Sequence, residues 1–226
     1  MTESFFDDRL AALYGRIAAA AGRSGRPAEA VRLIGASKTV PAARLSAAVA
    51  AGLTDLGENR VQEAEEKIPV VAPRPRWHLI GHLQSNKARR AAALFDCIQT
   101  VDSARLAVAL DRHVAELDRP APLDVLIEVN VSGEAAKHGV APAEAPALIA
   151  SLRRDCPRLA LRGLMTVGPL VEEPEAARPA YRALAALARD AGLAELSMGM
   201  SGDFEVAIEE GATMVRVGSA LFGARG

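Results

Sequence analysis

Eight short apolar runs alternate with helical stretches along most of this chain, and this alternation constrains the fold more than any other feature. The apolar runs predict strands near residues 31–37, 54–57, 77–80, 97–100, 123–130, 159–164, 195–197 and 213–217. Apolar residues at helical spacing predict helices near 3–21, 41–51, 59–67, 84–94, 102–116, 142–154, 175–190 and 201–210. Near-continuous apolar strands separated by helices indicate parallel pairing, with both faces of the sheet covered.

Two α/β architectures fit this order of elements: a closed (β/α)₈ TIM barrel and an open, doubly wound sheet. The doubly wound sheet is disfavoured because no GxGxxG motif follows an early strand. We find no linker, repeat or low-complexity tract, so we predict that residues 1–226 form a single (β/α)₈ barrel domain. In such barrels the functional residues lie in the loops that follow the strands.

Composition excludes several classes of protein. The chain has 226 residues, of which 50% are hydrophobic and 24% are charged, as expected for a globular domain with a full core. A net charge of -1 gives no general attraction for nucleic acid or an anionic membrane. The acidic amino terminus does not fit a signal peptide, and no apolar run approaches membrane-spanning length. We therefore expect a cytoplasmic protein.

The two cysteines, Cys97 and Cys156, predict buried thiols and no disulfide framework. The sequence has no CxxC pattern and no zinc motif, so it predicts no metal site.

Lys38 stands at the end of the first predicted strand, where Pro41 begins a helical pattern. A lysine amine among apolar neighbours loses hydration of its charged form and becomes a better nucleophile toward an aldehyde. The first hypothesis is therefore imine chemistry at Lys38. The alternative is an ordinary lysine at a strand end that reaches solvent.

The loops after the last two predicted strands contain small residues that suit a phosphate site. Ser201 is a candidate N-cap of the next helix, and Gly218 with Ser219 follows the eighth strand. A phosphate cradle made by these two loops recurs in (β/α)₈ barrels. Helix capping and tight turns are the alternative explanation, and Asp203 weakens the case for an anion.

Arg216 lies within the last predicted strand, where alternation places it on the same face as Met214 and Gly218. A cation inside an apolar strand needs a partner. The partner is either an acidic side chain or an acceptor on a bound ring, such as a pyridine nitrogen. An arginine facing that nitrogen would disfavour its protonation. A reactive lysine, a phosphate cradle and a partner for a ring nitrogen together describe a site for pyridoxal 5'-phosphate.

Several sequence blocks, in order along nearly the whole chain, resemble one known family. They are IGASKT at 34–39, LGENRVQE at 56–63, WHLIGHLQSNK at 77–87, VNV at 129–131, GLMT at 163–166, SMGMS at 197–201 and VRVG at 215–218. The chain resembles the pyridoxal phosphate homeostasis proteins, which have an alanine-racemase-type barrel. The resemblance implies that Lys38 forms an aldimine with the cofactor, that Ser201, Gly218 and Ser219 contact its phosphate, and that Arg216 lies near its ring nitrogen.

The resemblance also implies that Asn59, His82 and Met165 surround the cofactor. Each has a plainer explanation, since Asn59 could be only an N-cap, His82 a core or supporting histidine, and Met165 core filler.

Three functions compete. The family resemblance implies a carrier that serves intracellular vitamin B6 homeostasis without efficient catalysis, with pyridoxal phosphate as partner and cofactor-dependent apo-enzymes as recipients.

The second function is an amino-acid racemase, which would need a base on each face of the substrate. Tyr14 and Tyr181, the only tyrosines, fall in helical stretches away from strand ends, and the sequence shows no second domain after the barrel, although Cys97, Cys156 or His82 could serve as a base.

The third function is a class I aldolase-like reaction at Lys38, with Glu58 as the nearest candidate carboxylate. The residues alone do not decide between a monomer and a dimer, whereas the resemblance favours a monomer.

Overall fold

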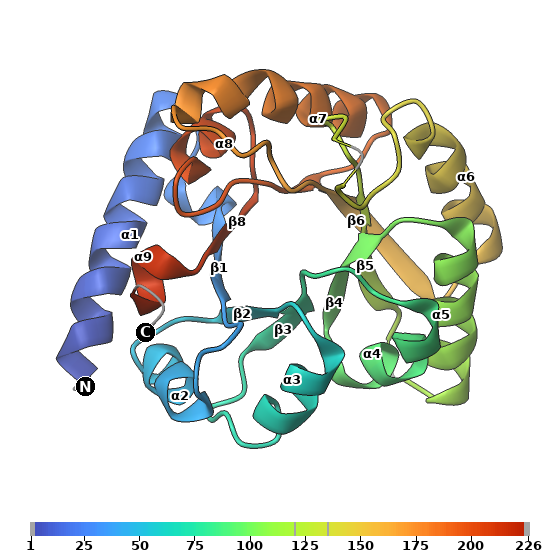
Figure 1. The fold of residues 1–226 in the computed structure, drawn as a ribbon, viewed down its shortest axis with the longest axis horizontal. Coiled ribbons are helices and arrows are strands. Elements are labelled where there is room, and N and C mark those ends of the chain that lie inside the picture. Colours follow the sequence, from blue (N-terminus) through green and yellow to red (C-terminus); the bar gives the residue numbers. More distant parts are fainter. Residues whose placement is uncertain (1–2, 120, 135, 224–226) are drawn as a thin grey trace.

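The computed structural model describes residues 3–119, 121–134 and 136–223, in which eight parallel strands close into a barrel in the order β1 to β8. The strands are β1 (Arg32–Ala36), β2 (Asp55–Glu58), β3 (Arg76–Leu79), β4 (Cys97–Val101), β5 (Leu123–Glu128), β6 (Leu159–Met165), β7 (Glu195–Ser197) and β8 (Met214–Val217). Closure occurs between β8 and β1, where Ile34 is in register with Arg216. This confirms the predicted (β/α)₈ barrel and all eight strands (Figure 1).

Helices surround the barrel. They are α1 (Glu3–Arg23), α2 (Ala42–Ala50), α3 (Val61–Lys67), α4 (Ala88–Leu94), α5 (Ala104–Glu116), α6 (Ala145–Asp155), α7 (Arg178–Asp190), α8 (Phe204–Glu209) and α9 (Ser219–Phe222). Three 3₁₀ turns are η1 (Ala28–Ala30), η2 (Ser85–Lys87) and η3 (Pro174–Ala177). The leading helix α1 packs against α2, α8 and α9 on the outside of the barrel (Figure 1). None of the helices within the described residues is both long and apolar enough to cross a membrane.

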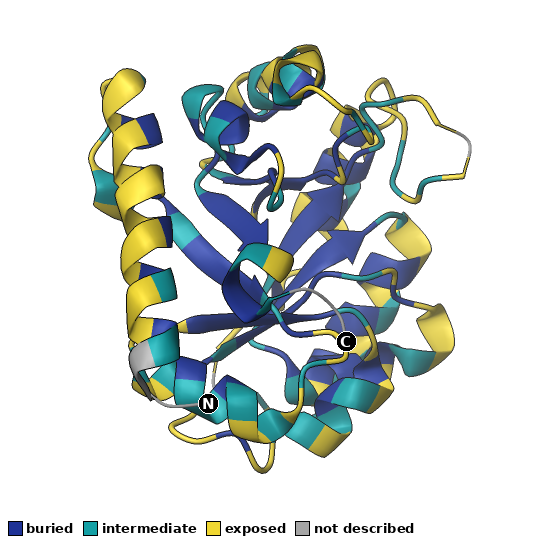
Figure 2. Ribbon diagram, turned by 60° about the vertical axis from the view of Figure 1, so that its left-hand side comes forward, coloured by how far each residue is buried: buried dark blue, intermediate teal, exposed yellow. Residues whose placement is uncertain are grey.

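Most of the apolar core lies between the sheet and the helices. Figure 2 shows buried strands and helices whose outer faces are exposed. In α7, for example, Tyr181, Leu184 and Ala188 are buried because they recur at helical spacing on one face. The two cysteines are buried free thiols, as predicted.

The inside of the barrel is different, because polar side chains occupy much of it. A small apolar cluster of Ile34, Leu126, Met165 and Met214 fills part of the interior. Strand alternation places Arg216 on the same face of β8 as Met214, whereas Val215 and Val217 join the outer core. Arg216 thus lies on the face of β8 that alternation predicted, and this face is the inner one.

Several predicted helices start a few residues too early, and one of these differences affects the loop after β7. The expected helix at 201–210 begins at Phe204, and its N-cap residue is Asp203 instead of Ser201. The turn before it is fixed by Gly199, whose φ is +93°. A Cβ at Gly199 would lie 2.6 Å from the Ala207 Cβ, so only glycine lets this loop pack against α8.

Candidate functional site

The turn that carries Lys38 is held from its amino-terminal side by a buried ion pair. Glu58, fully buried at the end of β2, accepts hydrogen bonds from Ser37 Oγ at 2.8 Å and from Lys67 Nζ at 2.5 Å. Lys67 also donates to the Ser37 carbonyl at 2.9 Å. The backbone before Lys38 is thus fixed, and Glu58 is committed to Lys67.

The residue after Lys38 has an unusual backbone. Thr39 has a φ of +63°, and its N–H donates to Glu63 Oε2 at 3.2 Å. A β-branched residue in this region is strained, and strain of this kind is common at functional sites. The Lys38 side chain itself is exposed, as in the alternative of a strand-end lysine that reaches solvent, and imine chemistry at Lys38 stays a prediction.

Lys38 lines a cavity of about 580 Å³ at the carboxyl ends of β1, β7 and β8. We call it the Lys38 pocket. Ser201, Arg216, Gly218 and Ser219 line the same cavity, and Val40, Pro41, Met200 and Phe222 give it apolar walls. Its volume lies in the range of small-molecule sites. The structure therefore brings together five of the eight residues that the sequence predicted for the site.

Arg216 is the buried cation of the Lys38 pocket. Its guanidinium donates to Ser197 Oγ at 2.7 Å and to the Thr166 carbonyl at 2.7 Å. Burial lowers the pKa of Arg216, while acidic groups farther away oppose the effect. Among the described residues, no carboxylate forms a salt bridge with this guanidinium. The first sequence-based alternative, a structural ion pair, is thus not what holds Arg216.

A chain of hydrogen bonds runs from Arg216 through the barrel interior. Ser197 Oγ, which accepts from Arg216, lies 2.6 Å from Gln99 Oε1 and donates to it. The Gln99 amide nitrogen lies 3.0 Å from His78 Nδ1, and His78 Nε2 lies 2.8 Å from Asp55 Oδ1. Because arginine only donates and a carboxylate only accepts, every bond in the chain points from Arg216 to Asp55.

The direction of these hydrogen bonds determines which ring nitrogen of His78 carries the proton. Its Nδ1 accepts from Gln99, so its proton lies on Nε2 and points to Asp55. Burial lowers the pKa of His78, with Asp55 opposing the effect. His78 is consequently a neutral, structural histidine that transmits hydrogen bonds.

The loops after β7 and β8 contribute backbone donors to the Lys38 pocket. Among the described residues, none accepts a hydrogen bond from the N–H groups of Ser201 and Gly202. Ser219 begins α9, so its N–H has no acceptor within that helix. The Gly218 N–H donates to Ser201 Oγ at 3.3 Å and ties the two loops together.

Asp203 does not place its negative charge in this cavity. Its carboxylate accepts from the Tyr181 hydroxyl at 2.6 Å and from the Met200 N–H at 2.7 Å. The Tyr181 hydroxyl belongs to α7 and the Met200 N–H to the turn before α8, and Asp203 is buried. Its effect on an anion in the Lys38 pocket is thereby reduced.

Asn59 and His82 lie in a second cavity of about 570 Å³, which we call the His82 pocket. Arg60, Gln62, Gln84, Lys87 and His138 also line it. Met165 is fully buried in the apolar cluster inside the barrel. The structure does not place Asn59, His82 and Met165 in the wall of the Lys38 pocket, and their contact with a cofactor stays a prediction.

His82 has two close neighbours in its pocket. Its Nδ1 lies 3.3 Å from Asp102 Oδ2, and its ring stacks on His138 with 3.8 Å between centroids and 9° between planes. His82 lies beyond the end of β3, so it belongs to the loop and not to the barrel interior.

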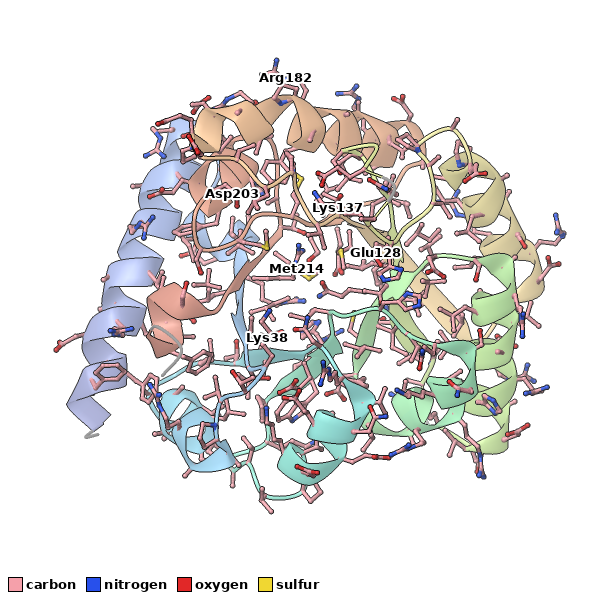
Figure 3. All side chains as sticks on the ribbon, in the orientation of Figure 1. Lys38, Glu128, Lys137, Arg182, Asp203 and Met214 are labelled. Carbon is pink, nitrogen blue, oxygen red and sulfur yellow. The ribbon has the colours of Figure 1, made fainter. Side chains whose placement is uncertain are left out.

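Glu128 ends β5 and faces the barrel opening from a different side than Lys38 (Figure 3). It is 5% exposed, and its Oε2 has no hydrogen-bond partner among the described residues. Burial raises the pKa of Glu128 to about 7, with a further contribution from the negative charge of Asp102 and an opposing one from Arg216. This carboxyl therefore changes its charge near neutral pH.

Comparison with known proteins places the chain in a family. Residues 9–226 match the model for the alanine racemase N-terminal domain. The pyridoxal phosphate homeostasis protein of Pseudomonas aeruginosa is 46% identical, covering 96% of this chain and 95% of that protein. That of Escherichia coli is 44% identical, covering 96% and 95%. The chain belongs to the pyridoxal phosphate homeostasis protein family.

A solved member of similar structure is PipY of Synechococcus elongatus, determined with pyridoxal phosphate bound. It superposes with a TM-score of 0.83 at 38% identity, covering 96% of this chain and 100% of PipY. The family resemblance and the barrel fold predicted from the sequence are thus confirmed.

In this member of the pyridoxal phosphate homeostasis family, three residues at the barrel mouth were not predicted from the sequence: Glu128, Asp102 and His138. Glu128 shares the parity of Leu126 on β5, so alternation could have placed its carboxyl inside the barrel. Asp102 and His138 follow the ends of β4 and β5, where loops in barrels of this type carry function. No local pattern links either residue to His82, because only closure of the barrel brings them together.

Proposed function

We propose that this protein binds pyridoxal 5'-phosphate in the Lys38 pocket and serves intracellular homeostasis of that cofactor. The observation that carries the proposal is Arg216, a buried cation without a carboxylate partner among the described residues, in the same cavity as Lys38. A bound group with an acceptor atom would supply the missing partner. The names of the relatives and the cofactor-bound PipY structure support the same ligand.

The residues of the Lys38 pocket fit the parts of this cofactor. Lys38 offers a primary amine, and the free N–H groups of Ser201 and Gly202 with the Ser219 N–H offer donors for phosphate oxygens. Arg216 offers a donor for a ring nitrogen, and its positive charge disfavours a proton there. The apolar walls suit an aromatic ring. Pyridoxal phosphate supplies an aldehyde, which condenses with an amine and releases water.

Lys38 is the proposed point of covalent attachment. Its amine loses two hydrogens and the aldehyde loses its oxygen as water, so the bond reverses when water or another amine reaches the carbon. The exposed position of Lys38 suits such an exchange. A carrier needs this reversibility, because it must release the aldehyde to recipients, which we propose to be cofactor-dependent apo-enzymes.

We further propose that the protein does not turn over a substrate efficiently. Several groups that could act as bases are occupied or inaccessible. Glu58 pairs with Lys67, and the Tyr181 hydroxyl donates to Asp203. Burial raises the pKa of both thiols, to about 11 for Cys156 and further for Cys97. These positions disfavour the aldolase-like and racemase readings of the sequence.

The first experiment adds pyridoxal phosphate to the purified protein, reduces the mixture with borohydride and maps the modified peptide. The chain has four lysines, and we expect the label on Lys38. A label spread over all four, or no label, would contradict the proposal. The loaded protein is then incubated with D- and L-alanine while optical rotation is followed. Brisk racemisation would overturn the non-catalytic reading, and Glu128→Gln would show whether Glu128 is the base.

Three finer properties belong to the proposal. The 226 residues act as one domain, the protein functions as a monomer, and it works in the cytoplasm. Light scattering of the apo and loaded protein at several concentrations tests the second, and a mass of two chains in either state would contradict it.

A further inference from the structure

Three potential metal ligands from three consecutive loops meet at the His82 pocket: His82 and His138 line its wall, and Asp102 lies beside His82. His82 follows β3, Asp102 follows β4 and His138 follows β5, so all three lie at the carboxyl ends of neighbouring strands. One ligand atom of each lies within 4.8 Å of the other two. Barrel closure thus gathers side chains that are far apart in the sequence.

The distances suit a small ion. Metal–nitrogen and metal–oxygen bonds of about 2.0 Å at tetrahedral angles separate neighbouring ligand atoms by about 3.3 Å. His82 Nδ1 and Asp102 Oδ2 already lie 3.3 Å apart. The exposed ring of His138 stacks on that of His82, and one of its nitrogens lies within 4.8 Å of the other two ligand atoms.

The backbone at His82 is fixed from two sides. Thr100 Oγ1 donates to the carbonyl of Gly81 at 2.9 Å. A Cβ at Gly81 would lie 2.3 Å from the Asn59 carbonyl oxygen, so the loop passes directly against the end of β2. His82 therefore projects from a defined position.

The backbone near His138 is also fixed, although its side chain is exposed. The Val140 N–H donates to the Glu128 carbonyl at 2.9 Å, and the Asn130 N–H donates to the Val140 carbonyl at 2.9 Å. Gly139 has a φ of +103° and packs against the same Glu128 carbonyl. Ligands held in place before binding lose less entropy when the ion arrives.

Two imidazoles and one carboxylate are a ligand set typical of zinc and related ions, and three protein ligands leave at least one coordination position open. We propose that His82, Asp102 and His138 bind a divalent transition-metal ion, with the open position facing the His82 pocket. Arg60 and Lys87 line that pocket, so their positive charges favour an anionic exogenous ligand, such as hydroxide or a carboxylate. This metal-binding role of His82 is separate from the cofactor contact that the sequence predicted for the same residue.

The test is a Co²⁺ titration of the full chain, free of any histidine tag, stripped with a chelator and without pyridoxal phosphate. Co²⁺ replaces zinc-type ions and reports coordination through its visible absorption bands. We expect one equivalent to bind with the bands of a low-coordinate site. Zn²⁺ should displace it, and Zn²⁺ should raise the melting temperature, because it binds the folded state.

Four variants make the test specific. His82→Ala, His138→Ala and Asp102→Asn each remove one ligand and should weaken Co²⁺ binding by at least about tenfold. His113→Ala is the matched control, because His113 Nδ1 also lies 2.8 Å from a carboxylate, that of Glu116, but has no second histidine beside it. Its affinity for Co²⁺ should equal that of the unchanged protein. Circular dichroism of each variant checks that it folds.

The proposal is overturned if the unchanged protein does not bind stoichiometric Co²⁺, or if His82→Ala and His138→Ala bind as tightly as it does. It is also overturned if His113→Ala loses as much affinity as the ligand variants. Each of these results concerns the protein without pyridoxal phosphate, so it leaves the proposed function of the Lys38 pocket untouched.

Discussion

The two cavities at the barrel mouth have nearly the same volume, about 580 and 570 Å³, but different chemistry. The Lys38 pocket combines apolar walls with one buried cation and unused backbone donors. The His82 pocket is lined almost entirely by polar and charged side chains. Size therefore does not distinguish them. The first suits an aromatic anion with a reactive carbonyl, and the second suits an ion and water.

The largest expected difference between the two pockets concerns their lysines, because Lys38 lines one pocket and Lys87 lines the other. Lys38→Ala should abolish all borohydride-stable attachment of pyridoxal phosphate, whereas Lys87→Ala should retain it fully. Lys38 is exposed, so its replacement should change the free energy of unfolding by less than about 0.5 kcal/mol. Mass spectrometry of the reduced proteins measures the first effect and urea denaturation the second. An unfolded Lys38→Ala variant would show a structural lysine.

Burial raises the pKa of Glu128, the negative charge of Asp102 raises it further, and the positive charge of Arg216 on the other side of the barrel opening lowers it. Its pKa of about 7 in the folded protein exceeds the ordinary value of 4.5. Between these values the unfolded chain releases its proton while the folded protein keeps it. The contribution of Glu128 to folding stability therefore falls as pH rises from about 4.5 through about 7, by about 3 kcal/mol at 1.4 kcal/mol per pKa unit.

Glu128→Gln should remove this pH dependence. The variant and the parent should be equally stable near pH 4.5, and the variant should be more stable by up to about 3 kcal/mol at pH 8. Urea denaturation across pH in chelator-treated buffer measures it. Parallel curves for the two proteins would show that Glu128 does not titrate in this range.

Arg216→Met tests whether the buried cation serves the ligand or the fold. Loss of a charged hydrogen bond of about 1.5–3 kcal/mol should raise the Kd for pyridoxal phosphate by about 10- to 100-fold. The apo-protein should melt about 4–8 °C below the parent, because methionine fills similar space and no carboxylate among the described residues loses a partner, but Ser197 Oγ and the Thr166 carbonyl each lose a donor. Absorbance titration and calorimetry separate the two effects. A fall in melting temperature without a change in Kd would assign Arg216 to the fold.

The smallest effect is expected at Ser201. Ser201→Ala removes one neutral hydroxyl beside free backbone donors and should raise the Kd for pyridoxal phosphate by about 3- to 10-fold. Ser151→Ala, at a partly exposed position of α6 that does not line the Lys38 pocket, is the matched control and should leave the Kd unchanged. Excess inorganic phosphate should compete less well with the cofactor in the Ser201 variant. Equal behaviour of the two serine variants would remove Ser201 from the phosphate contacts.

Much of the barrel was predictable from the sequence because its signals are local. Each apolar run is one strand, and alternation along β8 was enough to direct Arg216 inward. The start of α8 was not predictable in the same way. Ser201 has the chemistry of an N-cap, but Gly199 turns the chain and Asp203 takes that place.

The site was predictable only in part, since some of it depends on contacts between distant strands. Lys38 and Arg216 could be assigned to the same end of the barrel, because Lys38 follows the first predicted strand and Arg216 lies near the end of the last one. The commitment of Glu58 to Lys67 could not be foreseen, and neither could the partner of His82. These contacts depend on side-chain rotamers and on the path of the loops.

The hydrogen-bond chain from Arg216 to Asp55 couples five positions on five strands, so that a substitution at one of them affects the partners of the others. Its two ends fix the polarity of every bond between them, so no member can reverse its role alone. Among diverging sequences with this barrel, we expect residues 55, 78, 99, 197 and 216 to change together or not at all. Selection for a ligand in the Lys38 pocket would then also constrain Asp55, at the first residue of β2 and the opposite end of the barrel.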